Sequence, residues 1–285
     1  MRHPILVSLC VAGTIALSAC DQSNKDEVER AFQDVNVVDE TNLNDVMLSS
    51  ADPNEAVAYF QRTLSEKPDR IDLMRGLGTS LVRAKRNTEA VAVWSTATEH
   101  KDATNEDRVE LADALLRNNE WARADQVLDS IPPTYETFKR YRLEAMIADS
   151  NKEWNKSDSF YEIAVGLTTQ PASVMNNWGY SKLSRGDFAG AERLFSDAVR
   201  QDPSLFTAKN NLVMARAAQG NYSVPVLPVT QAERAQLLYT LGLSAVKQGD
   251  TEIGKGLLRD AIDTHPQHFE DAARSLRALE ANVAS

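Results

Sequence analysis

Four histidines and two cysteines are the side chains of this 285-residue chain best suited to bind a metal or act as nucleophiles. His265 and His268 flank a Pro-Gln pair and could form half of a metal site. We favour an interpretation without metal, because both lie beside a predicted helix end and no further ligand cluster is close. The hydrolase nucleophile elbow, the glycine-rich phosphate loop and the His-Glu-x-x-His motif are absent from the sequence. We therefore predict a chain that is not an enzyme, with no catalytic residues, metal, cofactor or small-molecule substrate.

Two asparagines, Asn177 and Asn211, are the strongest candidates for a binding role. They lie 34 residues apart, and each amide can both donate and accept hydrogen bonds. Aligned on one wall of a groove, they could bind a peptide backbone whatever its side chains. The alternative is that both are surface polar residues on helices. A mixture of thioether, phenol, amide and cation suits an apolar or extended peptide. The candidate partner-binding residues are Arg142, Met146, Asn177, Tyr180, Asn211 and Met214.

A ladder of small residues predicts the elements that position these side chains. Its members are spaced 34, 34, 33 and 34 residues apart, and each is followed four positions later by a bulky apolar residue. A fixed period of this length is typical of a stacked repeat array. Each unit holds two apolar-periodic segments of roughly 14 residues, which predicts a pair of helices. The small residues are Ala56, Ala90, Ala124, Ser157 and Ala191, and the bulky ones are Phe60, Trp94, Leu128, Tyr161 and Phe195.

With the ladder residue numbered 20 in each unit, other residue types also recur. Position 8 is small in most units, and glycine follows the first helix at Gly186, Gly220 and Gly249. Proline closes three units, at Pro68, Pro203 and Pro266. This pattern resembles the tetratricopeptide repeat. The resemblance implies an all-α fold, a right-handed superhelical solenoid of antiparallel helix pairs, whose concave face is lined by the first helices. The candidate binding residues belong to those first helices.

The repeats divide most of the chain into predicted segments. Residues 37–205 hold five repeats, and 206–234 hold a half repeat and a linker, because Pro225 and Pro228 cannot sit inside a regular helix. Thr230 and Glu233 form a capping-box pattern that starts the next helix. We predict a further repeat at 235–268 and a capping helix within 269–285.

The first nineteen residues read as a signal peptide. Residues 5–17 are mainly apolar, too few to span a bilayer as a helix, and suit the apolar core of a secretory signal. The following Leu17-Ser18-Ala19-Cys20 resembles the bacterial lipobox. That resemblance implies cleavage before Cys20 and acylation of Cys20 as a membrane anchor. The polar residues that follow, without an apolar period, indicate a flexible tether over 20–36. The alternative is an ordinary signal peptide with a chance cysteine.

Charge and the residue after Cys20 bear on partner and location. The net charge is −10 and no run of Lys or Arg occurs, so we expect no nucleic-acid partner. In enteric bacteria, aspartate directly after the acylated cysteine tends to retain lipoproteins in the inner membrane, a rule that does not hold in all bacteria. We expect a lipid anchor that faces the periplasm and lies in the outer membrane. Asp21 directly follows Cys20, so the inner membrane is the alternative.

Residues 172–280 also resemble the TadD-like lipoproteins of tight-adherence (Tad/Flp) pilus assembly. The resemblance rests on Asn176-Asn177-Trp178-Gly179-Tyr180, on Gly186-Asp187-Phe188 and on Glu233-Arg234-Ala235-Gln236-Leu237-Leu238-Tyr239. It implies a non-catalytic periplasmic scaffold that supports the pilus secretin, or another component of the machine, through its groove. The alternative is a different envelope scaffold, one that organises outer-membrane protein assembly or peptidoglycan hydrolases.

Overall fold

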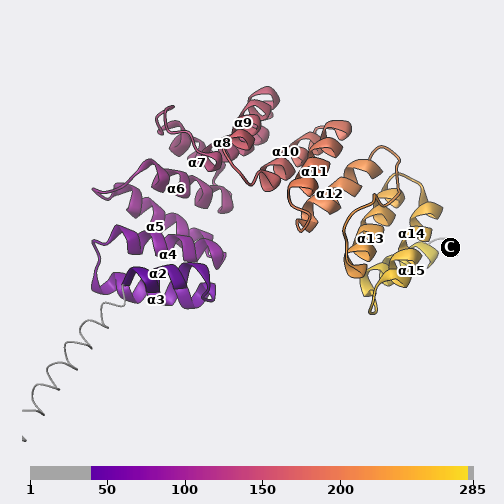
Figure 1. Ribbon diagram of the computed structural model, residues 1–285, viewed down its shortest axis with the longest axis horizontal. Coiled ribbons are helices and arrows are strands. Elements are labelled where there is room, and N and C mark those ends of the chain that lie inside the picture. Colours follow the sequence, from indigo (N-terminus) through magenta and orange to yellow (C-terminus); the bar gives the residue numbers. More distant parts are fainter. Residues whose placement is uncertain (1–39, 282–285) are drawn as a thin grey trace, which may run out of the picture. The chain divides into compact units, whose positions relative to one another are not determined.

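The computed structural model describes residues 40–281, which form fourteen α-helices and no strands (Figure 1). The predicted signal peptide, Cys20 and the tether lie outside these residues. The described chain divides into two compact units, residues 40–120 and 121–281. The boundary falls between two helices, inside the segment that the sequence assigns to the third repeat. No helix within 40–281 is both long and apolar enough to cross a membrane.

Each unit is built from short helices of similar length. The first unit contains α2 (Glu40–Ser49), α3 (Pro53–Glu66), α4 (Ile71–Arg83), α5 (Asn87–Glu99) and α6 (Asn105–Arg117). The second unit contains α7 (Trp121–Asp129), α8 (Phe138–Ser150), α9 (Trp154–Gly166), α10 (Ala172–Ser184), α11 (Phe188–Gln201), α12 (Phe206–Ala217), α13 (Gln231–Lys247), α14 (Thr251–Thr264) and α15 (Glu270–Ala281). Within each unit, helices that follow one another in the chain pack together as antiparallel neighbours. The predicted fold class, an all-helical stack of helix pairs, is confirmed.

The small-residue ladder lies in the core of both units. Every member from Ala56 to Ala191 has no exposed surface, and the bulky residue four positions later is at most 2% exposed. A Cβ atom added to Gly179 would lie 2.7 Å from the ring of Phe195. The repeat spacing therefore reflects a steric requirement: a small residue on one helix, such as Gly179, leaves room for a bulky side chain of the partner helix, such as Phe195.

From α4 onwards, the turn after each first helix uses a left-handed residue. Gly186, Gly220 and Gly249 have φ angles of 85°, 76° and 95°, as expected for a residue that ends a helix without a Cβ penalty. Asn119 has the same conformation with φ 65°. Lysine takes this place in two other repeats, at Lys85 and Lys152, with φ 59° and 61°.

In the first unit, arginines connect helices that are not consecutive in the chain. Arg83 donates from Nη1 to the backbone carbonyls of Met47 at 3.2 Å and Leu48 at 2.6 Å, close to the end of α2. Arg75 on α4 donates from Nε and Nη2 to the two carboxylate oxygens of Asp107 on α6, at 2.7 and 2.8 Å. Burial opposes the charge of Asp107, but the bonds from Arg75 and Thr104 outweigh it and lower its pKa. These bonds satisfy helix-end carbonyls and hold neighbouring repeats in register.

The second unit contains an extended segment, the strap, over residues 221–230, between α12 and α13. Leu227 of the strap packs against three buried clusters formed by α11, α12 and α13. The predicted capping box at its end is confirmed: Glu233 N donates to Thr230 Oγ1 at 3.1 Å and Thr230 N donates to Glu233 Oε2 at 2.8 Å. The strap thus covers apolar surface in the place where the other repeats have a second helix.

A buried lysine fixes the end of the strap. Lys209 on α12 is 2% exposed, and its Nζ donates to the carbonyl of Pro228 at 2.7 Å. The Oε1 atom of Glu233 lies 3.4 Å from the same nitrogen. A buried ammonium is costly unless it is paired and hydrogen-bonded, and both conditions are met here.

Replacing Leu227 with alanine should lower the free energy of unfolding by about 1–2 kcal/mol, below the range for a fully buried leucine because this side chain is partly exposed. The reason is the loss of contacts with three clusters at once. Val226→Ala is the matched control, since Val226 is fully exposed on the same strap, and its effect should stay within about 0.5 kcal/mol. Urea unfolding followed by circular dichroism measures both. Equal effects of the two substitutions would contradict a packing role for the strap.

Candidate functional site

A cavity of about 570 Å³ lies in the second unit. Its walls come mainly from first helices: Met146 and Asp149 on α8, Asn176, Asn177 and Tyr180 on α10, and Asn211 on α12. Trp121 and Tyr161 add aromatic surface from α7 and α9. The open surface of the cavity is mainly apolar, and we call it the groove below.

The structure places four of the six sequence-predicted binding residues in the groove and two outside its lining. Met146, Asn177, Tyr180 and Asn211 line the groove, whereas Arg142 and Met214 are not among its lining residues. Met214 accepts a weak hydrogen bond at sulfur from Asn210 Nδ2, at 3.8 Å. The Nε atom of Arg142 is buried and has no hydrogen-bond partner within residues 40–281.

The two predicted asparagines have different surroundings. Asn211 is 9% exposed, and its Nδ2 donates to Asn176 Oδ1 at 3.0 Å, which joins α12 to α10. Asn177 has no hydrogen-bond partner in the described part of the chain and is partly exposed beside the groove. The groove therefore offers the whole amide of Asn177 and the carbonyl oxygen of Asn211 to a bound backbone.

A group that sequence reasoning missed, the Asp149 carboxylate, lies in the wall of the groove. Three hydroxyls donate to it: Ser157 and Ser181 to Oδ1 at 2.5 and 2.6 Å, and Tyr161 to Oδ2 at 3.1 Å. Ser157, Tyr161 and Ser181 are each at most 3% exposed, so the carboxylate is fixed from the buried side. Asp149 and Met146 share one face of α8 because they are three residues apart.

The pKa of Tyr161 is raised well above its ordinary value. Burial of the phenol is the largest cause, and the negative charge of Asp149 and the hydrogen bond to it add to the effect. The Tyr161 hydroxyl therefore keeps its proton at neutral pH and remains a donor to Asp149. Its ring also stacks on Trp178, with ring centroids 6.2 Å apart, which helps to set the distance between α9 and α10.

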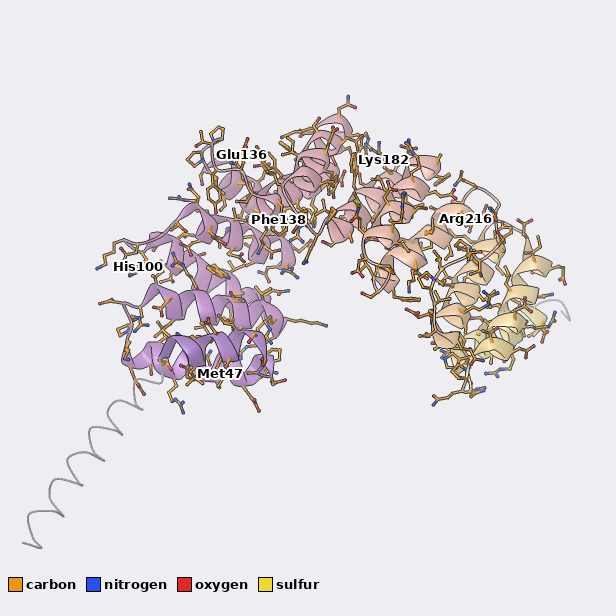
Figure 2. All side chains as sticks on the ribbon, in the orientation of Figure 1. Met47, His100, Glu136, Phe138, Lys182 and Arg216 are labelled. Carbon is orange, nitrogen blue, oxygen red and sulfur yellow. The ribbon has the colours of Figure 1, made fainter. Side chains whose placement is uncertain are left out.

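An ion-pair network holds α10 against α9. Asp158 on α9 accepts from Trp178 Nε1 at 2.6 Å, from Lys182 Nζ at 2.9 Å and from Arg185 Nη2 at 2.5 Å. Lys182 is seen on α10 in Figure 2. The Arg185 guanidinium also lies over the ring of Trp154, 5.5 Å from its centroid. Since α10 carries Asn176, Asn177 and Tyr180, this network supports one wall of the groove.

The histidines considered from the sequence have local partners. A ring nitrogen of His265 lies 2.8 Å from the carbonyl oxygen of Gln267, and Nε2 of His268 lies 2.8 Å from Glu270 Oε2. Within residues 40–281, no group of three or more His, Cys, Asp or Glu side chains is arranged to hold a metal ion.

Sequence comparison connects this geometry to a known family. A family model described as tetratricopeptide repeat matches residues 48–107 and 176–224, and a second model of the same description matches 236–268. The chain is 24% identical over 134 residues to mouse tetratricopeptide repeat protein 21B, an alignment that covers 44% of this chain and 10% of that protein. The chain thus spans about a tenth of the length of this curated relative.

Solved structures show the same fold at low sequence identity. A tetratricopeptide repeat protein from Parabacteroides merdae superposes with a TM-score of 0.53 at 13% identity, covering 91% of this chain and 99% of that one. The APC/C hetero-tetramer Cut9–Hcn1 gives a TM-score of 0.60 at 12% identity, with 83% of this chain and 48% of that chain covered. The human IFIT1 dimer with PPP-AAAA gives 0.54 at 15% identity, over 80% and 59% of the two chains. With its ladder buried and its helices paired, the chain is a tetratricopeptide-repeat protein.

Proposed function

We propose that this chain is a non-catalytic periplasmic lipoprotein that serves as a protein-interaction scaffold in Tad/Flp pilus assembly. The observation that carries the proposal is the groove on the first helices of the second unit, whose mainly apolar wall holds the Asn177 amide, which has no hydrogen-bond partner within residues 40–281. Such a surface suits an extended protein segment. The resemblance of residues 172–280 to TadD-like lipoproteins supports the pilus role, because it covers the helices that form most of the groove.

The groove would contact both the backbone and the side chains of a bound partner. The Asn177 amide and the Asn211 carbonyl oxygen can hydrogen-bond a peptide backbone, while Met146 and Tyr180 contact apolar side chains. Tyr180 is 57% exposed, so a partner can bury much of its ring. The pilus secretin, or another component of the machine, is the proposed partner.

The lipobox-like sequence supports an anchor on Cys20, which would hold the scaffold at the membrane surface. We place the anchor in the outer membrane, with the inner membrane as the alternative because of Asp21. Fractionation of the envelope, with Cys20→Ser as the unanchored control, decides between the two.

Deletion of the gene should abolish surface pili and reduce secretin multimers, and the wild-type gene should restore both. Asn177→Ala combined with Tyr180→Ala should fail to restore them, because it removes an amide and a ring from the groove without disturbing the core. Glu162→Ala, an exposed change on α9, should restore them fully. Electron microscopy of pili and non-reducing immunoblots of secretin are the measurements. Normal pili and multimers in the deletion strain would exclude the pilus role and direct attention to other envelope assemblies.

A further inference from the structure

Asp149 is the one carboxylic acid or basic residue that lines the groove within residues 40–281. The other lining side chains are aromatic, thioether, hydroxyl or amide groups. A single fixed charge in a mainly apolar wall has a larger effect on binding than the same charge among other ions, because fewer ions and less water screen it.

The carboxylate is held in position but has no cationic partner in the described chain. Its three partners are neutral hydroxyls, which orient it and leave its charge uncompensated. A carboxylate offers about four lone-pair sites, and Oδ2 accepts only from Tyr161. One further donor can therefore reach this oxygen from the groove.

The nearest arginine on the same helix, Arg142, forms no ion pair with Asp149, although its charge acts on the neighbouring Tyr161 hydroxyl. Arg142 precedes Asp149 by seven residues, which is about 10 Å along the axis of α8. Arg142 forms no ion pair with any group in residues 40–281 and does not line the groove. A cation that pairs directly with Asp149 would therefore have to come from a bound partner.

We propose that the groove selects partner segments with a lysine or arginine flanked by apolar residues, and that this cation binds Asp149. The proposal rests on the proposed function in one respect, that the groove binds an extended peptide. The net charge of −10 favours approach of such a segment over an acidic one. The apolar neighbours of the cation would contact Met146 and Tyr180, beside Asp149.

Dye-labelled peptide pools test this directly. Each pool is an acetylated, amidated decapeptide of random small and apolar residues, with one central position fixed as Lys, Arg, Gln or Glu. Anisotropy titrations with the full chain should show the Lys and Arg pools binding at least tenfold more tightly than the Gln pool, about 1.4 kcal/mol. The Glu pool should bind most weakly. The ratio of Lys to Gln affinity should fall as sodium chloride is raised.

Asp149→Asn isolates the charge, because it keeps the size of the side chain and one acceptor oxygen. It should reduce the ratio of Lys to Gln affinity to within twofold while the Gln pool still binds. Asp260→Asn removes the same charge from an exposed site on α14 and should leave the ratio unchanged. If Asp149→Asn does not fold, the pool ratios and their salt dependence in the wild-type chain still decide the question.

The outcomes separate this inference from the proposed function. Equal binding of all pools, weakened by Asn177→Ala, would overturn the role of Asp149 and leave a peptide groove. A Lys preference that survives Asp149→Asn would also overturn it. Binding of no pool would overturn both proposals.

Discussion

Replacing Phe195 with alanine should lower the free energy of unfolding by about 3–5 kcal/mol, the range for truncating a buried aromatic residue. Phe195 has no exposed surface, and its ring lies against the backbone of α10 at Gly179 and beside Leu212 of the next repeat. Its loss would leave a cavity between two repeats that the short helices cannot close. Urea unfolding followed by circular dichroism and tryptophan fluorescence gives the change.

Phe138→Ala is the matched control, because Phe138 is 41% exposed at the start of α8. Its effect should be below about 1 kcal/mol. A loss smaller than this for Phe195→Ala would mean that the ladder of large and small residues does not hold the repeats together.

Replacing Asp158 with alanine should cost about 2–3 kcal/mol, because it leaves Lys182, Arg185 and the Trp178 indole without their shared acceptor. We expect less than for a fully buried ion pair, because 28% of the Asp158 side chain is exposed. Asp260→Ala, an exposed aspartate on α14, should have little effect. Chemical denaturation of the three proteins at neutral pH is the measurement.

The cost of Asp158→Ala should also depend on pH. Burial would raise the pKa of Asp158, but the hydrogen bonds from Trp178, Lys182 and Arg185 outweigh it, so its pKa in the folded protein is lowered. A lowered pKa means that the stabilisation is complete above the unfolded value, about pH 4, and is lost as the pH falls through the folded value. The difference between wild type and variant should be constant from pH 5 to 7 and shrink below about pH 4. A difference that grew on acidification would contradict this assignment.

Much of the fold can be predicted from the sequence because packing geometry leaves a periodic trace. The sequence separation from Ala56 to Ala90 corresponds to one pair of antiparallel helices, and both residues are buried for the same steric reason. Features that depend only on residues close in sequence can also be predicted, such as the Thr230 capping box and the left-handed conformation of Gly186. The division between Glu120 and Trp121 cannot be predicted from the sequence, because the left-handed turn at Asn119 resembles those at Lys85, Lys152 and Gly186.

The groove was only partly predictable. The register of the repeat predicts Asn177, Tyr180 and Asn211 as groove residues, and the structure places them in its lining. The same register also contains Asp149, at position 12 of the fourth unit. Its importance depends on Ser157, Tyr161 and Ser181, which converge on it from α9 and α10. Such convergence has no signature in a single sequence. The strap was expected from its prolines, whereas the buried ammonium of Lys209 that secures it resembles any surface lysine in the sequence.

The strap also has a consequence for how an array of this kind can change its length. From the start of α10 to the start of α12 the chain advances 34 residues, but from α12 to α13 it advances only 25. Leu227, with Tyr222, Val224 and Val229 of the strap and the bond from Lys209, takes the place of a whole second helix. An insertion or deletion between successive first helices therefore need not be a whole repeat, provided that apolar side chains still cover the surface where a second helix would pack. A fixed-period search would lose its frame at this point, although the stacking of helices continues through it.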